Sequence, residues 1–372
     1  MSRTTSLARV SLVLLTTLGL AALAGCPSSA PDAVSGRPRI EQAPGPLKKS
    51  ELLVELPLDL SNTPDAMCLL PDGNIILSVP NFNDSRQPSL FMKITPDNQA
   101  EVFLELPPHP ETGKPMGPLG ICVAPSGDLF FADLQQEGDR QSRVMRIKMK
   151  DGQPQEMVPV IEGFTVSNAV IVRDGYLYVS ETKIDPEARP ATSGVFRFKL
   201  EDLEDAIVVL ATPVTDDPHL IGMLETFDEE LPLGADGLAF DTEGNLYIGN
   251  FSDGTVHRFR FDAEGNVTAN EIFARAPFMK SADGLFFDPR TRKIYVADSR
   301  ANAVQVVSLD GSVATLAQNG VTDGLDGGMD QPCEVLIRGR EVIVSNMDWP
   351  VPGCINTQYD KPCTLSVIKL DE

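Results

Sequence analysis

Basic residues are scarce in this chain. Its 372 residues include 31 Lys and Arg against 53 Asp and Glu, for a formal net charge of −22, and only 3 His. A chain without clustered Lys and Arg cannot displace the counterions of a phosphate backbone, so nucleic acid is excluded as a partner. Because there are so few His, and no Cys or His pair at zinc-binding spacing, a zinc site is not expected either.

Long apolar segments and helical periodicity are missing beyond the first 25 residues. No later apolar run reaches the length of a bilayer-spanning helix. Hydrophobic residues at 42% and charged residues at 23% are ordinary globular values, which excludes a wholly disordered chain. The 29 Gly and 30 Pro exceed average usage and indicate many short elements joined by turns.

The N-terminus has the features of an export signal. Arg3 and Arg9 flank the start of an uncharged apolar stretch over residues 10–24, which is too short to span a bilayer comfortably. The sequence LAGC at residues 23–26 resembles the lipobox of bacterial lipoproteins, in which the Cys becomes the acylated N-terminus. A plain secretory signal with a chance cysteine is the alternative.

We therefore expect residues 1–25 to be a lipoprotein signal peptide and residues 26–50 to be the lipidated Cys26 and a flexible tether rich in Pro, Ser, Ala and Gly. Pro27 follows Cys26, where Asp commonly marks inner-membrane retention, so the outer membrane and periplasm are favoured. The expected location is the bacterial cell envelope. We expect a monomer that contacts the membrane only through this lipid anchor.

Six similar segments recur along the rest of the chain. Each has a short apolar strand, a turn of the Asp-Gly, Gly-Asn or Pro-Arg kind, and a second strand rich in Ile, Leu, Val and Tyr, which is a hairpin signature. They recur at a spacing of about 50 residues, which is typical of repeat architectures. The segments are 64–79, 118–132, 167–180, 235–249, 282–297 and 332–345.

Two more strand-like stretches follow most hairpins, as at 90–94 with 102–106, 195–200 with 206–210, and 304–309 with 313–316. Four strands repeated at this spacing are typical of propeller blades. The last copy has only three strands, and residues 51–56 are predicted to supply the fourth and close the ring. The sequence predicts an all-β fold, a six-bladed β-propeller of four-stranded blades over residues 51–372.

The second residue of each repeat is predicted to face the upper mouth of the central channel, because the first strand of every blade starts there. Carboxylates converging from several blades raise one another's pKa, and a hard cation relieves this repulsion. A mixed set of Asp and Asn oxygens suits Ca²⁺. In chain order these residues are Asp65, Leu119, Asn168, Asp236, Asp283 and Cys333.

We predict a divalent metal site, with Ca²⁺ as the ion, held by Asp65, Asn168, Asp236 and Asp283. A plainer interpretation stays open for the Asp-Gly pairs. Asp at a strand entrance often bonds its own backbone while the following Gly takes a positive φ.

The segments ADGLAFDTEGNLYIGN (235–250), ADGLFFDPRTRKIYVADS (282–299) and SNAVIVRDGYLYVS (167–180) resemble the senescence marker protein/gluconolactonase/luciferin-regenerating enzyme family. The family has one divalent metal, often calcium, at the top of the channel. The resemblance implies that Asp65 replaces the family's early Glu ligand, that Asn168 is its Ser-Asn-Gly Asn, and that Asp236 or Asp283 is its Asp-Gly Asp. In the family that Asp is also proposed to activate the water or the substrate.

The chain departs from this pattern at three positions. Asp65 stands in Pro-Asp-Ala and is one methylene shorter than Glu, Asn168 is followed by Ala, and Leu119 offers no ligand. A His pair like that of paraoxonase-like esterases is not evident. His109 and His219 lie in links between blades, and no spacing indicates that they meet.

Two functions from different classes follow. The first is a gluconolactonase-like, metal-dependent hydrolase of a lactone or related ester, with Asp236 and Asp283 as the catalytic residues. The alternative is a non-catalytic cell-surface binding propeller, with a structural calcium ion or none. The fold serves both classes, so it does not decide between them.

Two further segments are predicted on the same face as the ring. The link 323–330 has three acids and three Gly, and is interpreted as a flexible acidic loop or a second calcium site without EF-hand spacing. The insertion 346–362 in the last blade holds Trp349, the only Trp, and is predicted to act as a lid or specificity loop.

Cysteine use fits an oxidising compartment. Cys333, Cys354 and Cys363 fall near the top of the last blade, so one disulfide is expected among them, with Cys354–Cys363 favoured as a pin for the lid. Cys68 and Cys122 occupy the same position in adjacent blades and form either a bridge or two buried thiols.

Overall fold

The computed structural model describes residues 46–136, 140–185 and 187–371. The signal peptide expected at 1–25, the lipidation site Cys26 and most of the tether lie outside the described residues. Within the described part, no helix has both the length and the apolar character needed to cross a membrane. The helical segments there are three short 3₁₀ turns, η1 (Leu200–Leu203), η2 (Val214–Asp216) and η3 (Ser299–Ala301).

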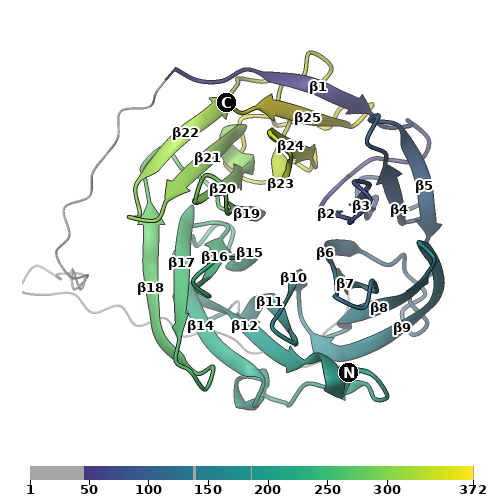
Figure 1. Cartoon of the computed structure of the whole chain (residues 1–372), viewed down its shortest axis with the longest axis vertical. Helices are drawn as coiled ribbons and strands as arrows, with labels where there is room; N and C mark the ends of the chain where they lie inside the picture. The colour runs from purple at the N-terminus through teal and green to yellow at the C-terminus, as the bar shows by residue number, and fades with distance from the viewer. Residues whose placement is uncertain (1–45, 137–139, 186, 372) are drawn as a thin grey trace, which may run out of the picture. The chain divides into compact units, whose positions relative to one another are not determined.

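Six antiparallel sheets are arranged around a central axis, as Figure 1 shows. The first two blades contain β2 (Met67–Leu69), β3 (Ile75–Val79), β4 (Leu90–Ile94) and β5 (Ala100–Glu105), then β6 (Pro118–Val123), β7 (Leu129–Asp133), β8 (Ser142–Lys150) and β9 (Gln153–Phe164). The next two contain β10 (Ser167–Arg173), β11 (Tyr176–Asp185), β12 (Ala191–Lys199) and β14 (Leu220–Thr226), then β15 (Ala235–Phe240), β16 (Leu246–Asn250), β17 (Thr255–Phe261) and β18 (Val267–Arg275). The last two contain β19 (Leu285–Asp288), β20 (Lys293–Asp298), β21 (Ala303–Ser308) and β22 (Val313–Gln318), then β23 (Pro332–Arg338), β24 (Glu341–Asn346), β25 (Thr364–Lys369) and β1 (Ser50–Glu55). The predicted six-bladed propeller is confirmed.

The N-terminal strand closes the ring. Strand β1 pairs antiparallel with β25, from Ser50 opposite Ile368 to Glu55 opposite Thr364. The two ends of the propeller therefore lie in one sheet, and β1 covers the edge that β25 would otherwise present. The closure predicted for residues 51–56 is confirmed to within one residue.

The core lies between neighbouring blades. Three of the second strands, β3, β7 and β16, are buried along their whole length, and the Ile and Leu side chains of β3 are fully covered. The faces of adjacent blades meet through aromatic contacts such as Phe91 against Phe131, with ring centroids 5.0 Å apart in an edge-on arrangement. The outermost strands alternate in exposure, as in β18, because only one of their faces packs on a neighbour.

One predicted strand belongs to a different sheet. The stretch 206–210 was expected to be the fourth strand of the third blade, but β13 (Val208–Val209) pairs parallel with β9 and adds a fifth strand to the second blade. The fourth strand of the third blade is β14 instead. Leu210 is buried and Val208 is partly buried in the apolar cluster that the second and third blades share, and Val208 and Val209 pair with Ile161 and Glu162 of β9. Strand-like composition predicts an extended segment but not the edge to which it adds.

Candidate functional site

Five of the six ring positions line one cavity at the axis. Its volume is about 440 Å³, and Asp65, Leu119, Asn168, Asp236 and Asp283 contribute to its lining. The sixth position, Cys333, is buried beside it, with its thiol donating toward the carbonyl oxygens of Pro64 and Ser345 at 3.6 Å each. The repeat register read from the sequence therefore places these residues together, and their role in binding metal stays a prediction.

Glycine after the ring residue lets the inner strands approach closely. A Cβ on Gly237 would lie 2.4 Å from the backbone oxygen of Asp283, and a Cβ on Gly120 would lie 2.5 Å from that of Asn168. Neither Gly237 nor Gly284 has a φ in the left-handed range. The turn interpretation of Asp-Gly, which needs a positive φ, is therefore wrong here, and the glycines serve close packing between blades.

The ring aspartates face one another in a buried environment. The carboxyl groups of Asp236 and Asp283 are in side-chain contact, and Asp65 acts on both through its charge. Burial raises the pKa of Asp65 to about 7. Burial, and then the charge of neighbouring carboxyls, raises the pKa of Asp236 and of Asp283 well above the ordinary value. Asp236 and Asp65 are each 8% exposed, so water does little to screen them.

A fourth carboxyl, Glu334, was missed by the sequence analysis. It is half-buried, and its pKa is raised well above the ordinary value by burial and by the charges of Asp65 and Asp236. The register of β23 against β24 shifts between Pro332 and Glu334, as it does beside the ring residues of β6, β10 and β15. A Cβ on Gly284 would lie 2.4 Å from its Oε1, so the glycine of the neighbouring blade makes room for it. The signal was present, because Glu334 stands at the repeat position that Gly fills in the two preceding blades.

Two hydroxyl groups hold the ring side chains. Ser299 Oγ lies 2.7 Å from Asp283 Oδ2 and 2.7 Å from the carbonyl oxygen of Pro332, so its single proton can serve either acceptor. Thr182 donates to the carbonyl oxygen of Ala235 at 2.7 Å and accepts from Asn168 Nδ2 at 3.2 Å. Thr182 lies within β11 and Ser299 directly follows β20, and both of these are second strands, outside the repeat position that predicts the ring.

The insertion in the last blade forms part of the cavity wall. We call residues 346–362 the lid loop. Met347, Trp349, Val351 and Cys354 of this loop line the cavity, which confirms that it borders the site. Trp349 packs on Phe82 of the first blade, with ring centroids 5.1 Å apart. The other walls are mainly apolar, so the cavity has an acidic floor and hydrophobic sides.

The donor set at the floor fits a hard cation. Within the described residues, no three Asp, Glu, His or Cys side chains are already drawn together as a complete metal-binding group. The axial carboxyls nevertheless lack any cationic partner, since no Lys or Arg contributes to lowering the pKa of Asp65 or Glu334. Oxygen atoms from carboxylates and one amide are the ligands that calcium takes. A cation here would be bound by Asp236 and Asp283 together with oxygens of Asp65 and Asn168.

The expected disulfide does not form. Cys68, Cys122, Cys333, Cys354 and Cys363 are all free. Cys333 points toward the axial carbonyls, while the thiol of Cys363 lies 3.9 Å from the carbonyl oxygen of Ser61 in the first link. The Cys354–Cys363 bridge is thus wrong for this structure, because the two thiols occupy different environments. Cys68 and Cys122 are two thiols whose pKa is raised by burial.

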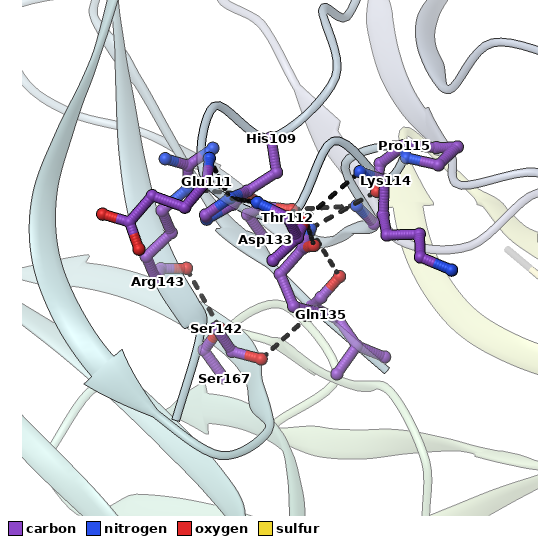
Figure 2. A network of polar contacts seen from close by, with 12 residues as sticks. His109, Glu111, Thr112, Lys114, Pro115, Asp133, Gln135, Ser142, Arg143 and Ser167 are labelled. Carbon is purple, nitrogen blue, oxygen red and sulfur yellow. Dashed lines mark hydrogen bonds and ion pairs between the residues drawn. The ribbon is translucent and has the colours of Figure 1, made fainter. Parts of the chain in front are cut away.

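The two link histidines have local partners. His109 is 4% exposed, and its Nδ1 accepts from the backbone N–H groups of Glu111 and Thr112 at 3.2 and 3.3 Å. Figure 2 shows it beside the network in which Arg143 and Gln135 contact Asp133. His219 bonds Asp217 at 2.8 Å. Neither residue lines the axial cavity, so the structure assigns them no part in that site.

Comparisons with known proteins were made by family, by sequence and by structure. No family model matches the chain, and no curated protein matches it. Among solved structures, a luciferin-regenerating enzyme has a TM-score of 0.59 at 12% identity, over 87% of this chain and 97% of that one. A gluconolactonase from Xanthomonas campestris has a TM-score of 0.55 at 14% identity, over 90% and 99%. A calcium-binding protein, regucalcin, from Agrobacterium tumefaciens has 0.53 at 14%, over 87% and 96%.

The chain shares the fold of these proteins. The structural neighbours are those that the sequence resemblance implied, although the identities are too low to carry residue roles across. The roles of the axial residues therefore rest on their own geometry in this structure.

Proposed function

We propose that this protein is a calcium-dependent hydrolase of lactones or related esters, with its active site in the axial cavity. The observation that carries the proposal is the set of buried carboxyls on the cavity floor that have no cationic partner. Asp65, Asn168, Asp236 and Asp283 would hold the cation. The shared fold with a gluconolactonase supports the same reaction class.

The cation, Asp236 and Asp283 would have different roles in the reaction. When bound, the cation supplies Lewis acidity for an ester carbonyl. Asp236 is held by Asn168 and by the backbone N–H of Gly237, which favours its ionised form as a ligand. Asp283 is held by the Ser299 hydroxyl alone among hydrogen-bond donors, so its carboxylate is the group we assign to accept a proton from the attacking water.

Ser299 is suited to a change in the protonation of Asp283. Its hydroxyl proton has two acceptors at the same 2.7 Å, Asp283 Oδ2 and the carbonyl oxygen of Pro332. While Asp283 is ionised, Ser299 donates to it. Once Asp283 holds a proton, the hydroxyl can turn to Pro332, so neither group is left without a partner.

The cavity limits the substrate to a small molecule with apolar parts. Its volume of about 440 Å³ is in the range of ordinary small-molecule pockets. Leu119, Phe251 and Trp349 contribute hydrophobic lining, while Gln135 and Lys183 add polar groups at the wall. A lactone ring or short ester with a hydrophobic substituent matches this surface, with its carbonyl directed to the acidic floor.

We also propose that the protein is exported and anchored by a lipid on Cys26, which would place the reaction in the cell envelope at the outer membrane or in the periplasm. The lipobox-like LAGC sequence and the basic and apolar segments before it support this. The propeller would act as a monomer, with its β1–β25 pairing closing the ring within one chain.

Hydrolysis of a panel of lactones and aryl esters tests the function. Asp283→Asn is expected to lower kcat/KM by about 10² or more, because the proton acceptor is lost while the size of the side chain is kept. Removing calcium with a chelator should abolish turnover, and adding it back should restore it. Asp326→Asn, which removes an exposed acid from the link 323–330, is the matched control and should keep full activity.

Two results would decide against the hydrolase. Unchanged turnover in both Asp236→Asn and Asp283→Asn would remove the axial carboxyls from catalysis. Calcium binding without hydrolysis of any ester in the panel would favour the binding propeller with a structural ion.

A further inference from the structure

A second pair of buried carboxyls lies at the base of the lid loop. Asp330 ends the link between β22 and β23 and is 3% exposed, while Asp348 starts the lid loop and is 2% exposed. Burial and the charge of Asp330 raise the pKa of Asp348 to about 8, and burial raises that of Asp330 to about 7. These residues are not ring positions and do not line the axial cavity. They form a separate acidic cluster.

The hydrogen-bond donors around this pair leave oxygen atoms without partners. Asp348 Oδ2 accepts from the backbone N–H of Asp360 at 2.6 Å, and Asp330 Oδ1 accepts from Asn356 Nδ2. Asp348 Oδ1 is fully buried and has no hydrogen-bond partner, and the Tyr359 hydroxyl beside it also has none. A buried carboxylate oxygen left in this state costs free energy unless something binds to it.

No basic side chain neutralises the pair. The ion pairs among the described residues include neither carboxyl, and no Lys or Arg lowers the pKa of Asp330 or Asp348. The only basic residue of the lid loop is Lys361, whose Nζ lies 3.5 Å from the carbonyl oxygen of Leu58 in the first link. Among the described residues, the two carboxyls are therefore buried without a basic partner.

We propose that Asp330 and Asp348 together bind one calcium ion at the base of the lid loop. Calcium tolerates irregular geometry and takes six to eight oxygens, so two carboxylates from different loops can be completed by main-chain carbonyls and water. Magnesium demands near-ideal octahedral geometry, which two loops do not readily supply. The inference is independent of the proposed hydrolase, because it uses none of the axial residues.

The ion would join the link 323–330 to the lid loop, which borders the axial cavity and is also bonded to the first blade. Asp330 comes from the link 323–330, Asp348 from the lid loop, and Asn83 Nδ2 of the first blade donates to the carbonyl oxygen of Asp348 at 3.0 Å. The next residue, Trp349, packs on Phe82 and lines the cavity. Calcium at this site would therefore fix the position of the Trp349 wall.

Calorimetric titration of the chelator-stripped protein with calcium tests the site, and the Asp236→Asn background separates it from the axis. In that background one ion is expected to bind. Adding Asp348→Asn should weaken its binding by at least about tenfold, because one of two charged ligands is lost. Asp330→Asn should do the same, while Asp326→Asn on the same link should leave the affinity unchanged.

Terbium provides a second readout through the only Trp. Excitation of Trp349 should sensitise the emission of terbium bound beside Asp348, and Asp348→Asn should remove that emission in the Asp236→Asn background. Trp349→Phe should remove the sensitised emission while calorimetry still detects the ion. The inference is overturned if the Asp236→Asn protein binds no calcium, or if Asp348→Asn binds it as tightly as Asp236→Asn alone. Far-UV circular dichroism of each variant checks that the propeller is folded.

Discussion

Two buried aspartates of this propeller differ in the charge of the groups around them. Asp133, at the end of β7, is 0% exposed and accepts from the Gly117 N–H at 2.9 Å, Gln135 Nε2 at 3.1 Å and Arg143 Nε at 2.8 Å (Figure 2). Asp236, at the axis, is nearly as buried but faces other carboxyls. Both carboxyls are buried, so the charge of their neighbours is what distinguishes them.

The charge of the neighbouring groups is opposite at Asp133 and at Asp236. At Asp133 the protein supplies its own counter-charge, because Arg143 Nε lies 2.8 Å from Asp133 Oδ2. At the axis it supplies more negative charge, so the folded state resists ionisation of Asp236 and Asp283. The lid-base pair of Asp330 and Asp348 follows the axial pattern rather than that of Asp133.

The largest expected effect on stability comes from substituting Asp133. Asp133→Asn should lower the free energy of unfolding by about 3–5 kcal/mol, because Arg143 is left buried without its counter-charge. Urea denaturation measures it. Asp174→Asn, which breaks the exposed Arg173–Asp174 pair, should change stability by less than about 0.5 kcal/mol. Equal losses in the two variants would contradict the structural role of Asp133.

Calcium should stabilise the protein through the axial cluster. At a hundredfold excess over its Kd, one bound ion adds about 2.7 kcal/mol to the free energy of unfolding. The measurement belongs in the Asp348→Asn variant, where the lid-base site does not contribute. Adding Asp283→Asn should remove most of this gain. A gain that survives both substitutions would show that the ion binds elsewhere.

Removing one axial charge should change the free energy of unfolding in the opposite direction from removing the charge of Asp133. In chelator, Asp236→Asn is expected to raise the free energy of unfolding by on the order of 1 kcal/mol, because a carboxyl that is buried among like charges becomes neutral. Thermal unfolding of both variants in the same buffer gives the test. Destabilisation by Asp236→Asn without calcium would erase the distinction between the two aspartates.

The smallest expected effect is on the pH dependence of stability, through the axial residue Asp65. The folded pKa of Asp65 is raised to about 7 from 3.8, so between these values the unfolded chain has released a proton that the folded chain keeps. Stability of the chelated protein should therefore fall as pH rises from about 4 to about 7 through this group. Asp65→Asn should flatten that slope, and saturating calcium should flatten it too. An unchanged slope in Asp65→Asn would contradict the raised pKa.

The sequence was sufficient for the blades and for most of the ring, because a hairpin repeat carries its own register. Asp65, Asn168, Asp236 and Asp283 share one repeat position, and a shared position in a propeller means a shared place around the axis. The same logic missed Glu334, which stands one residue after the shared repeat position, where the two preceding blades have Gly. A shared position predicts which residues lie together, but not that the next side chain along the strand also reaches the cluster.

Contacts that depend on unrelated loops were also beyond prediction. Cys354 and Cys363 are nine positions apart in one loop, yet their thiols face different surroundings. Asp330 and Asp348 belong to separate loops, and their pairing depends on how the lid loop folds over the link. The segment 206–210 was extended as expected but joined the neighbouring blade. These outcomes follow from tertiary packing, which a single sequence leaves open.

A calorimetric calcium titration of the chelator-stripped protein and its Asp236→Asn variant at neutral pH tests the axial metal site directly. The wild-type protein should bind one ion more than the variant, and this ion should be the one required for ester hydrolysis. Equal numbers of bound ions in the two proteins, or no binding to either, would contradict the assignment of the axial carboxyls as a metal site.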